Sequence, residues 1–199
     1  MKFCAILLAA ALTAQGQSGP VAAFHCNEGS GSTIQGGQRG LHTGTLNGAG
    51  WTASGKFGSA LVFDGVNDWV SIPDHPQLDL TAGATLMAWV NPAALSNWRT
   101  IVLKEQPGEA CYYLYSGPGD VANGGGRFAG NYVDTSGGAQ LPLNQWTHVA
   151  MTYDGATIRV YRNGIQVASR AQAGVFEQSA SPLKIGGNAT WGEWWQGSI

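Results

Sequence analysis

The hydrophobic positions of this chain fall in short runs separated by turn residues, and no helical period longer than one turn stands out. The clearest pattern covers Gln145 to Arg170, where three runs rich in β-branched and aromatic residues are separated by Asp154-Gly155 and Asn163-Gly164. Asn-Gly favours a two-residue type I′ turn, because both central residues of that turn need positive φ. The pattern therefore predicts an antiparallel meander of three strands.

The predicted turn also sets the register of the last two strands of the meander. With Asn-Gly at the tip, Arg162 lies opposite Ile165 and Val160 lies opposite Val167. The first strand of the meander differs from the other two, because it carries bulky residues on both faces. Such a strand is predicted to be central in its sheet and covered on both sides.

Further strands are predicted where apolar runs end at Gly, Pro, Asn or Asp. They are Val21–Cys26, Ser59–Phe63, Trp69–Ile72, Ala84–Val90, Thr100–Lys104, Cys111–Tyr115, Arg127–Val133 and Leu183–Ile185. The second and third of these are predicted to form a hairpin across Asp64 to Asp68, and Asn91-Pro92 to end the fourth. Gly117 to Gly126 holds five glycines and a proline, which predicts a mobile loop. The many short strands predict an all-β, two-sheet antiparallel β-sandwich.

Composition agrees with a single turn-rich domain. The chain has 199 residues with 30 glycines, and only 11% of its residues are charged. A chain of this length buries enough surface to fold without a metal or disulfides. The formal net charge is −2 and the basic residues are not clustered, so a nucleic-acid partner is not expected.

The amino terminus carries a pattern typical of secretory signal peptides. One lysine precedes a short apolar run within Met1 to Gly16, which predicts a signal over residues 1–16 and an extracellular protein. The run is too short for a permanent membrane span, and a disordered tail is the alternative. Cys26 and Cys111 would remain after cleavage; they could form a disulfide, or each could be a small buried side chain.

Five motifs, in order along the chain, resemble the laminin-G-like, concanavalin-A-like jelly-roll family. They are Leu61-Val62-Phe63-Asp64-Gly65 with Asn67-Asp68-Trp69-Val70, Met87-Ala88-Trp89-Val90, Trp146-Thr147-His148-Val149-Ala150 leading to Tyr153-Asp154-Gly155, Val160-Tyr161-Arg162-Asn163-Gly164, and Leu183-Lys184-Ile185-Gly186-Gly187-Asn188. The resemblance implies one jelly-roll domain over residues 20–199. It also implies a further strand beyond Ile199, so that the domain is expected to be truncated before its last strand and Val21–Cys26 to present an unpaired edge.

The carboxylates do not suggest catalysis. Glycosidases of this general fold carry two or three carboxylates on alternate residues of one strand, so that an acid and a nucleophile face the sugar together. Here the glutamates occur singly, mostly beside Gly or Pro: Glu28, Glu105, Glu109, Glu177 and Glu193. We therefore expect a domain that is not an enzyme.

The resemblance further implies a structural calcium ion where the first strand, the Asp-Gly turn and the last strand meet. The matching positions are Asn27, Glu28 and Asp64. Calcium is bound by several oxygens, from carboxylates, amides and backbone carbonyls. The alternative is that Asn27 and Asp64 are ordinary turn residues, since both types cap their own backbone.

Exposed aromatic rings are the expected ligand site, because a pyranose presents an apolar C–H face that stacks on a flat ring. The candidates near predicted loops or strand ends are Trp98 with Arg99, Tyr112 and Tyr113, and Trp191, Trp194 and Trp195. From these the predicted ligand residues are Trp98, Arg99, Trp191 and Trp194. The alternative is core packing, the more common use of large aromatic side chains. Packing is predicted for three tryptophans within strands, Trp69, Trp89 and Trp146.

Together these observations predict a secreted, non-catalytic recognition module. The expected partner is a glycan, with calcium as a possible structural cofactor. The first alternative is a protein-adhesion or spacer module of a longer extracellular protein, and a weaker one is a glycoside-hydrolase domain. The longer protein would carry further domains.

Overall fold

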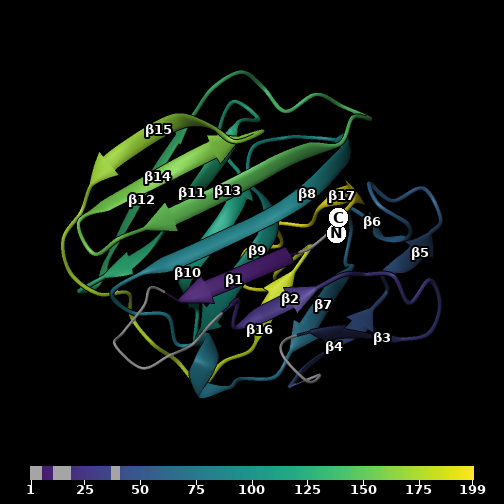
Figure 1. Ribbon diagram of the computed structural model, residues 1–199, viewed down its shortest axis with the longest axis horizontal. Coiled ribbons are helices and arrows are strands. Elements are labelled where there is room, and N and C mark those ends of the chain that lie inside the picture. Colours follow the sequence, from purple (N-terminus) through teal and green to yellow (C-terminus); the bar gives the residue numbers. More distant parts are fainter. Residues whose placement is uncertain (1–5, 11–18, 37–40) are drawn as a thin grey trace.

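The computed structural model describes residues 6–10, 19–36 and 41–199, with side chains from residue 19 onward. Figure 1 shows two antiparallel sheets packed face to face. The nine-stranded sheet contains β1 (Ile6–Ala10), β2 (Ala22–Phe24), β5 (Gly50–Thr52), β6 (Ala60–Asp64), β8 (Ala84–Ala94), β13 (Thr147–Tyr153), β14 (Thr157–Arg162), β15 (Ile165–Ala171) and β17 (Gln196–Ser198). The eight-stranded sheet contains β3 (Thr33–Gly36), β4 (His42–Asn47), β7 (Trp69–Ile72), β9 (Arg99–Gln106), β10 (Glu109–Ser116), β11 (Ala122–Phe128), β12 (Asn131–Gly137) and β16 (Leu183–Ile185). One 3₁₀ turn, η2, spans Pro76–Leu78. The predicted two-sheet sandwich is confirmed.

The meander forms as predicted, except for one register shift. β13, β14 and β15 are adjacent, β13 is central beside β8, and Asn163 and Gly164 have φ values of 50° and 81° at the turn. Arg162 pairs with Ile165 as expected, but Val160 pairs with Ala168. The predicted partner, Val167, is the extra residue of a β-bulge. Both Val167 and Ala168 pack against the hydrophobic core, which a regular alternation of side chains would not allow.

The predicted hairpin across Asp64 to Asp68 is wrong, because β6 and β7 belong to different sheets. The segment is a corner closed by its own side chains. Asp64 Oδ1 accepts from Val66 N at 2.8 Å, and Asp68 Oδ2 accepts from Asp64 N at 2.9 Å. The chain therefore crosses from one sheet to the other here. β8 also continues past Pro92 to Ala94, where its edge pairs irregularly with β17.

The predicted mobile loop is also partly wrong, because Gly124 to Gly126 lie in β11. The glycines allow the sheets to approach closely. A Cβ atom at Gly124 would lie 2.5 Å from Met151 Cγ, and one at Gly126 would lie 2.4 Å from Phe176 Cε1. Packing space, not chain flexibility, explains this glycine run.

The predicted unpaired edge of the first strand is present on one side of β2, because β1 is its single partner strand within the described residues. β2 pairs with β1, with Phe24 opposite Ile6. β1 and β17 lie end to end along one edge of β8: β17 pairs with Asn91 to Ala94 and β1 pairs with Ala84 to Met87. Of the predicted signal segment, residues 1–5 and 11–16 lie outside the described residues.

The core lies between the two sheets, and its largest fully buried side chains include Trp195, Tyr112, Phe24, Phe63 and Phe176. Tyr112 donates from its hydroxyl to Leu78 O at 2.6 Å, which satisfies its polar end inside the core. Within the described ranges, the structure contains no long apolar helix that could cross a bilayer.

Cys26 and Cys111 are both buried and no disulfide joins them. Burial also raises the pKa of the Cys111 thiol. The three tryptophans predicted to pack in the core, Trp69, Trp89 and Trp146, are only half-buried and lie outside the core cluster. That prediction is wrong, because alternation on their strands turns these rings to the outer faces of the sandwich.

Candidate functional site

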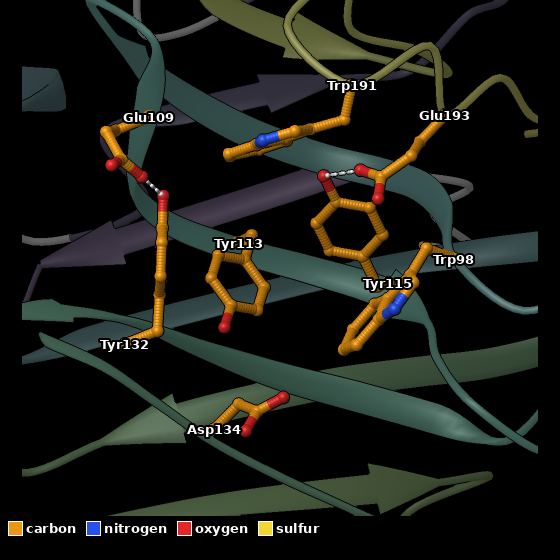
Figure 2. A pocket seen from close by; sticks show the side chains of 8 residues that line it. All are labelled: Trp98, Glu109, Tyr113, Tyr115, Tyr132, Asp134, Trp191 and Glu193. Carbon is orange, nitrogen blue, oxygen red and sulfur yellow. Dashed lines mark hydrogen bonds between the residues drawn. The ribbon is translucent and has the colours of Figure 1, made fainter.

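A hollow of about 360 Å³ lies on the outer face of the eight-stranded sheet. It is bordered by β10, β12, the residue before β9 and the segment between β16 and β17 (Figure 2). Its lining side chains are Trp98, Glu109, Tyr113, Tyr115, Tyr132, Asp134, Trp191 and Glu193. We call it the Trp191 hollow. Its volume is within the range of small-molecule sites.

Alternation along β10 supplies the centre of the Trp191 hollow. Tyr112 and Leu114 belong to the main core, whereas Tyr113 and Tyr115 belong to a separate cluster on the outer face. Gly125 pairs with Tyr113 on one side and with Asp134 on the other. A Cβ atom at Gly125 would lie 2.3 Å from Val133 O, so the backbone approach there requires glycine. The missing side chain leaves Tyr113 and Asp134 facing each other across an open floor.

Five aromatic rings surround the opening. The Tyr113 ring lies 5.2 Å from the Tyr115 ring and 6.1 Å from the Tyr132 ring. Trp98 meets Tyr115 edge to face at 5.8 Å, and Trp191 meets Tyr132 at 6.2 Å. Trp98 and Trp191 are 37% and 43% exposed, so their faces are open to a ligand. Such a ring of flat apolar faces suits stacking against a sugar.

Buried Asn188 holds the segment that carries Trp191. Its Nδ2 donates to Thr100 Oγ1 at 2.8 Å and to Tyr115 Oη and Glu193 Oε2, both at 3.1 Å. Its Oδ1 accepts from Trp191 N at 2.9 Å. One amide therefore ties the Trp191 segment to β9 and β10, so the hollow is formed before any ligand binds.

Three carboxylates border the rings, each with its own partners. Glu109 accepts from the Tyr132 hydroxyl and pairs with Arg127 Nη1 at 2.6 Å, and these contacts lower its pKa. Glu193 Oε2 accepts from the Tyr115 hydroxyl at 2.8 Å.

The third carboxylate, Asp134, accepts through Oδ2 from Asn123 Nδ2 at 2.8 Å. Burial raises the pKa of Tyr132 to about 12, and the pKa values of Tyr113 and Tyr115 rise further, so all three phenols stay protonated. The Tyr115 and Tyr132 hydroxyls already donate to Glu193 and Glu109, so the phenol that remains as a donor for a ligand is Tyr113.

The structure brings two of the four predicted ligand residues together. Trp98 and Trp191 both line the hollow. Arg99 instead donates to Trp194 O at 2.8 Å and to Ser96 Oγ at 2.7 Å. Trp194 stacks on Trp69 with ring centroids 5.4 Å apart. Arg99 and Trp194 thus support the segment that carries Trp191 and do not line the hollow.

The three predicted calcium ligands lie apart. A Cβ atom at Gly58 would lie 2.7 Å from Asn27 Oδ1, which places Asn27 at the loop before β6. Asp64 is the last residue of β6, and five strand residues span about 13 Å. Glu28 Oε1 accepts from Gln35 N at 2.8 Å. These residues therefore do not fit a shared calcium site, and Asp64 caps its own turn.

Metal ligands do not gather elsewhere in the part of the chain that the structure describes. No group of three or more His, Cys, Asp and Glu side chains there is placed to hold a metal ion.

Sequence reasoning missed most of the hollow. Tyr113 was among the candidate rings, and Tyr115 could have been added to it, because alternate residues of one strand share a face. The glutamates Glu109 and Glu193 seemed isolated only because they are far apart in the sequence. Asp134 joins them because β12 folds back beside β11.

A second hollow lies on the opposite face of the sandwich, over the nine-stranded sheet. Its lining side chains are Lys56, Trp89, Trp146, His148 and Asn163, and we call it the Trp89 hollow. Trp89 and His148 are directly paired on β8 and β13, with ring centroids 5.4 Å apart. Lys56 Nζ lies 4.5 Å from the centre of the Trp89 ring, a cation–π distance.

Comparison with known proteins identifies a family. Residues 64–199 match the family described as the concanavalin A-like lectin/glucanases superfamily. The fold resembles domain 4 of AbnA, a GH43 extracellular arabinanase from Geobacillus stearothermophilus solved with arabinotriose, with a TM-score of 0.61 and 23% identity over 78% of each chain. It also resembles a putative carbohydrate binding protein from Bacteroides ovatus, with a TM-score of 0.56 and 22% identity over 70% of this chain and 40% of that one.

A curated protein, mouse pappalysin-1, is 44% identical over 50 residues. The matched segment covers 23% of this chain and 3% of pappalysin-1. The chain is thus similar to a small part of a much longer protein.

Proposed function

The chain belongs to the concanavalin A-like lectin/glucanase superfamily, and from this premise we propose that it is a secreted, non-catalytic carbohydrate-binding module. The Trp191 hollow is the proposed binding site. The observation that carries the proposal is the ring of five aromatic side chains on an outer sheet face, two of them open to solvent. The fold alone does not decide function, so the argument rests on this site.

Stacking and hydrogen bonding would share the work of binding. The faces of Trp98 and Trp191 would cover the apolar faces of sugar rings. The carboxylates of Asp134 and Glu193 would accept hydrogen bonds from sugar hydroxyls. Because Asn188 already fixes the Trp191 segment, little ordering cost would remain on binding.

A glycan array with the folded chain tests the proposal, and arabinan oligosaccharides are a suitable first set. We expect binding that Trp98→Ala weakens by about tenfold or more, which corresponds to about 1.4 kcal/mol. The matched control is Trp89→Ala on the opposite face, which should leave affinity unchanged. A glycan-silent chain that captures an extracellular protein would instead support an adhesion or spacer role.

Catalysis is tested in the same samples by following release of reducing ends. A glycosidase needs a carboxylic acid whose pKa is raised. Glu109 has the opposite shift, since the Tyr132 hydroxyl and Arg127 lower its pKa. We therefore expect binding without hydrolysis, and hydrolysis that Glu193→Gln abolishes would overturn the non-catalytic assignment.

A further inference from the structure

We propose that the Trp191 hollow prefers glycans that carry protonated amino groups, such as deacetylated hexosamines, over neutral glycans and over glycans that carry carboxylates. This inference rests on the proposed function and adds the charge of the ligand to it. Three features of the hollow support it: the charge of its lining, the faces of its rings and the Tyr113 hydroxyl, which makes no hydrogen bond to another described residue.

The lining of the hollow is acidic. Of its eight residues three are carboxylates, and none is Lys, Arg or His. Glu109 is compensated by Arg127, whose Nη1 lies 2.6 Å from its carboxylate. Glu193 has neutral hydrogen-bond donors, the Tyr115 hydroxyl and the Asn188 amide. Its negative charge therefore remains for a ligand.

Asp134 adds a second such charge at the floor. Its carboxylate accepts from Asn123 Nδ2 at 2.8 Å. Arg170 approaches from β15, but it donates to the main-chain carbonyl of Asp134 at 3.0 Å and not to the carboxylate. A ligand ammonium between Glu193 and Asp134 would gain attraction that a neutral hydroxyl lacks, and a ligand carboxylate would be repelled.

The aromatic rings of the hollow also favour a positively charged ligand. The face of an aromatic ring attracts a cation held within about 6 Å of its centre. This chain already uses that contact: Arg127 lies 5.5 Å from the centre of the Tyr132 ring, at the edge of the hollow. The open faces of Trp98 and Trp191 would act on a ligand cation in the same way.

The Tyr113 hydroxyl is a further polar group at the floor of the hollow that is open to a ligand. Tyr113 is only 7% exposed, and its hydroxyl makes no hydrogen bond to another described residue. Figure 2 shows this hydroxyl directed into the hollow on the side of Asp134. Because this hydroxyl is reached from the hollow, a ligand donor or acceptor can bond to it.

Four oligosaccharides with the same β-1,4-linked backbone test the inference: chitosan hexaose, chitin hexaose, cellohexaose and an oligoglucuronate. They differ in carrying an amine, an acetamide, a hydroxyl and a carboxylate. Calorimetry at slightly acidic pH, where the sugar amine is protonated, should give chitosan hexaose an affinity at least about tenfold above cellohexaose. The oligoglucuronate should bind more weakly than both.

Charge-neutralising variants assign this preference to the hollow. Glu193→Gln and Asp134→Asn keep the shape of each side chain, so they should lower the affinity for chitosan hexaose by at least about tenfold and lower the affinity for cellohexaose less, which removes most of the preference for the amine. Asp154→Asn is the matched control, because it removes the same charge from an exposed turn on the other sheet. It should leave the preference unchanged.

The outcomes separate the two proposals. Binding of chitosan hexaose that is equal to or weaker than that of cellohexaose, or that is absent at millimolar concentration, would overturn the charge inference. Binding of any other glycan would still support the proposed function. An amine preference that survives in both hollow variants would also overturn the charge inference, because the charges would then act elsewhere. Silence towards every glycan, including the array, would overturn the proposed function itself.

Discussion

The two hollows on opposite faces of the sandwich contain similar residues but differ in how firmly they are built. Both present tryptophan on an outer sheet face. In the Trp191 hollow, the segment that carries the tryptophan is tied to two strands by buried Asn188. In the Trp89 hollow, Trp89 contacts Lys56, a half-exposed side chain from the loop before β6. Aromatic composition alone therefore does not identify a binding site; the rigid support of the rings does.

The floors of the two hollows also differ. Gly125 leaves the floor of the Trp191 hollow open between Tyr113 and Asp134. In the Trp89 hollow, the paired rings of Trp89 and His148 line the floor. The charges are opposite as well, since carboxylates line the first and Lys56 lines the second. Both hollows hold a fixed polar side chain, since Asn163 Oδ1 accepts from His148 N, but carboxylates line only the Trp191 hollow.

Removing Asn188 should have the largest effect. Asn188→Ala removes the amide bonds to Thr100, Tyr115 and Glu193 and leaves the last two bonded to each other, so we expect a loss of about 1–3 kcal/mol in the free energy of unfolding. It should also weaken glycan binding by more than tenfold, because the Trp191 segment loses its tie. Urea unfolding and calorimetry measure the two effects.

The control for Asn188 is the asparagine of the second hollow. Asn163→Gly keeps the positive φ of the turn and removes a side-chain oxygen that accepts from His148 N at 2.9 Å. It should leave glycan affinity unchanged. Equal loss of binding in both variants would mean that the two hollows do not differ as argued.

Closing the floor of the Trp191 hollow should come next in size. Gly125→Ala places a Cβ atom 2.3 Å from Val133 O, so β12 must shift. We expect a loss of about 1–3 kcal/mol in stability, together with weaker binding. Gly50→Ala is the matched control, because a Cβ atom there meets nothing within 4 Å. Unchanged stability of Gly125→Ala would show that β12 yields easily and that the open floor is not required.

A matched pair of tryptophans compares the hollows directly. Trp191→Ala should weaken glycan binding by about tenfold and change stability little, because the ring is 43% exposed. Trp146→Ala, in the second hollow, should leave binding unchanged. Calorimetry with the tightest glycan from the array measures both, and the reverse result would move the site to the Trp89 hollow.

The sequence predicted the fold better than the site, for a physical reason. Strand periodicity and Asn-Gly turn chemistry are local, so the meander and the two-sheet sandwich followed from them. The assignment of β6 and β7 to different sheets depends on side-chain bonds within Asp64 to Asp68 that no hydrophobic pattern reveals. The bulge at Val167 likewise depends on packing against the hydrophobic core, which is formed by tertiary contacts.

The site combines residues that only the tertiary fold brings together. Trp98 and Trp191 were predicted because each is an aromatic residue near a loop. Tyr132 and Glu193 were not, since their contacts with Glu109 and Tyr115 connect segments far apart in sequence. The prediction of Trp194 was wrong for the same reason, because its ring stacks on Trp69, a residue far away in sequence.

The smallest expected effect is a difference in pH dependence between the hollows. Burial lowers the pKa of His148, at the edge of the Trp89 hollow, from its usual value of 6.5. At a pH just below that value the unfolded chain binds a proton that the folded chain does not. The free energy of unfolding therefore keeps the full contribution of neutral His148 above about pH 6.5. It falls as the pH drops towards the pKa of His148 in the folded chain. In the Trp191 hollow, Glu109 has a pKa lowered from 4.5, so its contribution is lost only at more acidic pH.

His148→Gln isolates the contribution of the Trp89 hollow. Stability measured by urea unfolding between about pH 8 and pH 5 should fall less steeply in His148→Gln than in the unaltered chain. Burial also lowers the pKa of His42, which contributes in the same range and stays in both proteins, so the difference between the two profiles belongs to His148. Glycan affinity should be equal in both, since His148 lies on the opposite face. Identical pH profiles would show that His148 is as well solvated in the folded chain as in the unfolded one, and the Trp89 hollow would then be more open than its paired rings indicate.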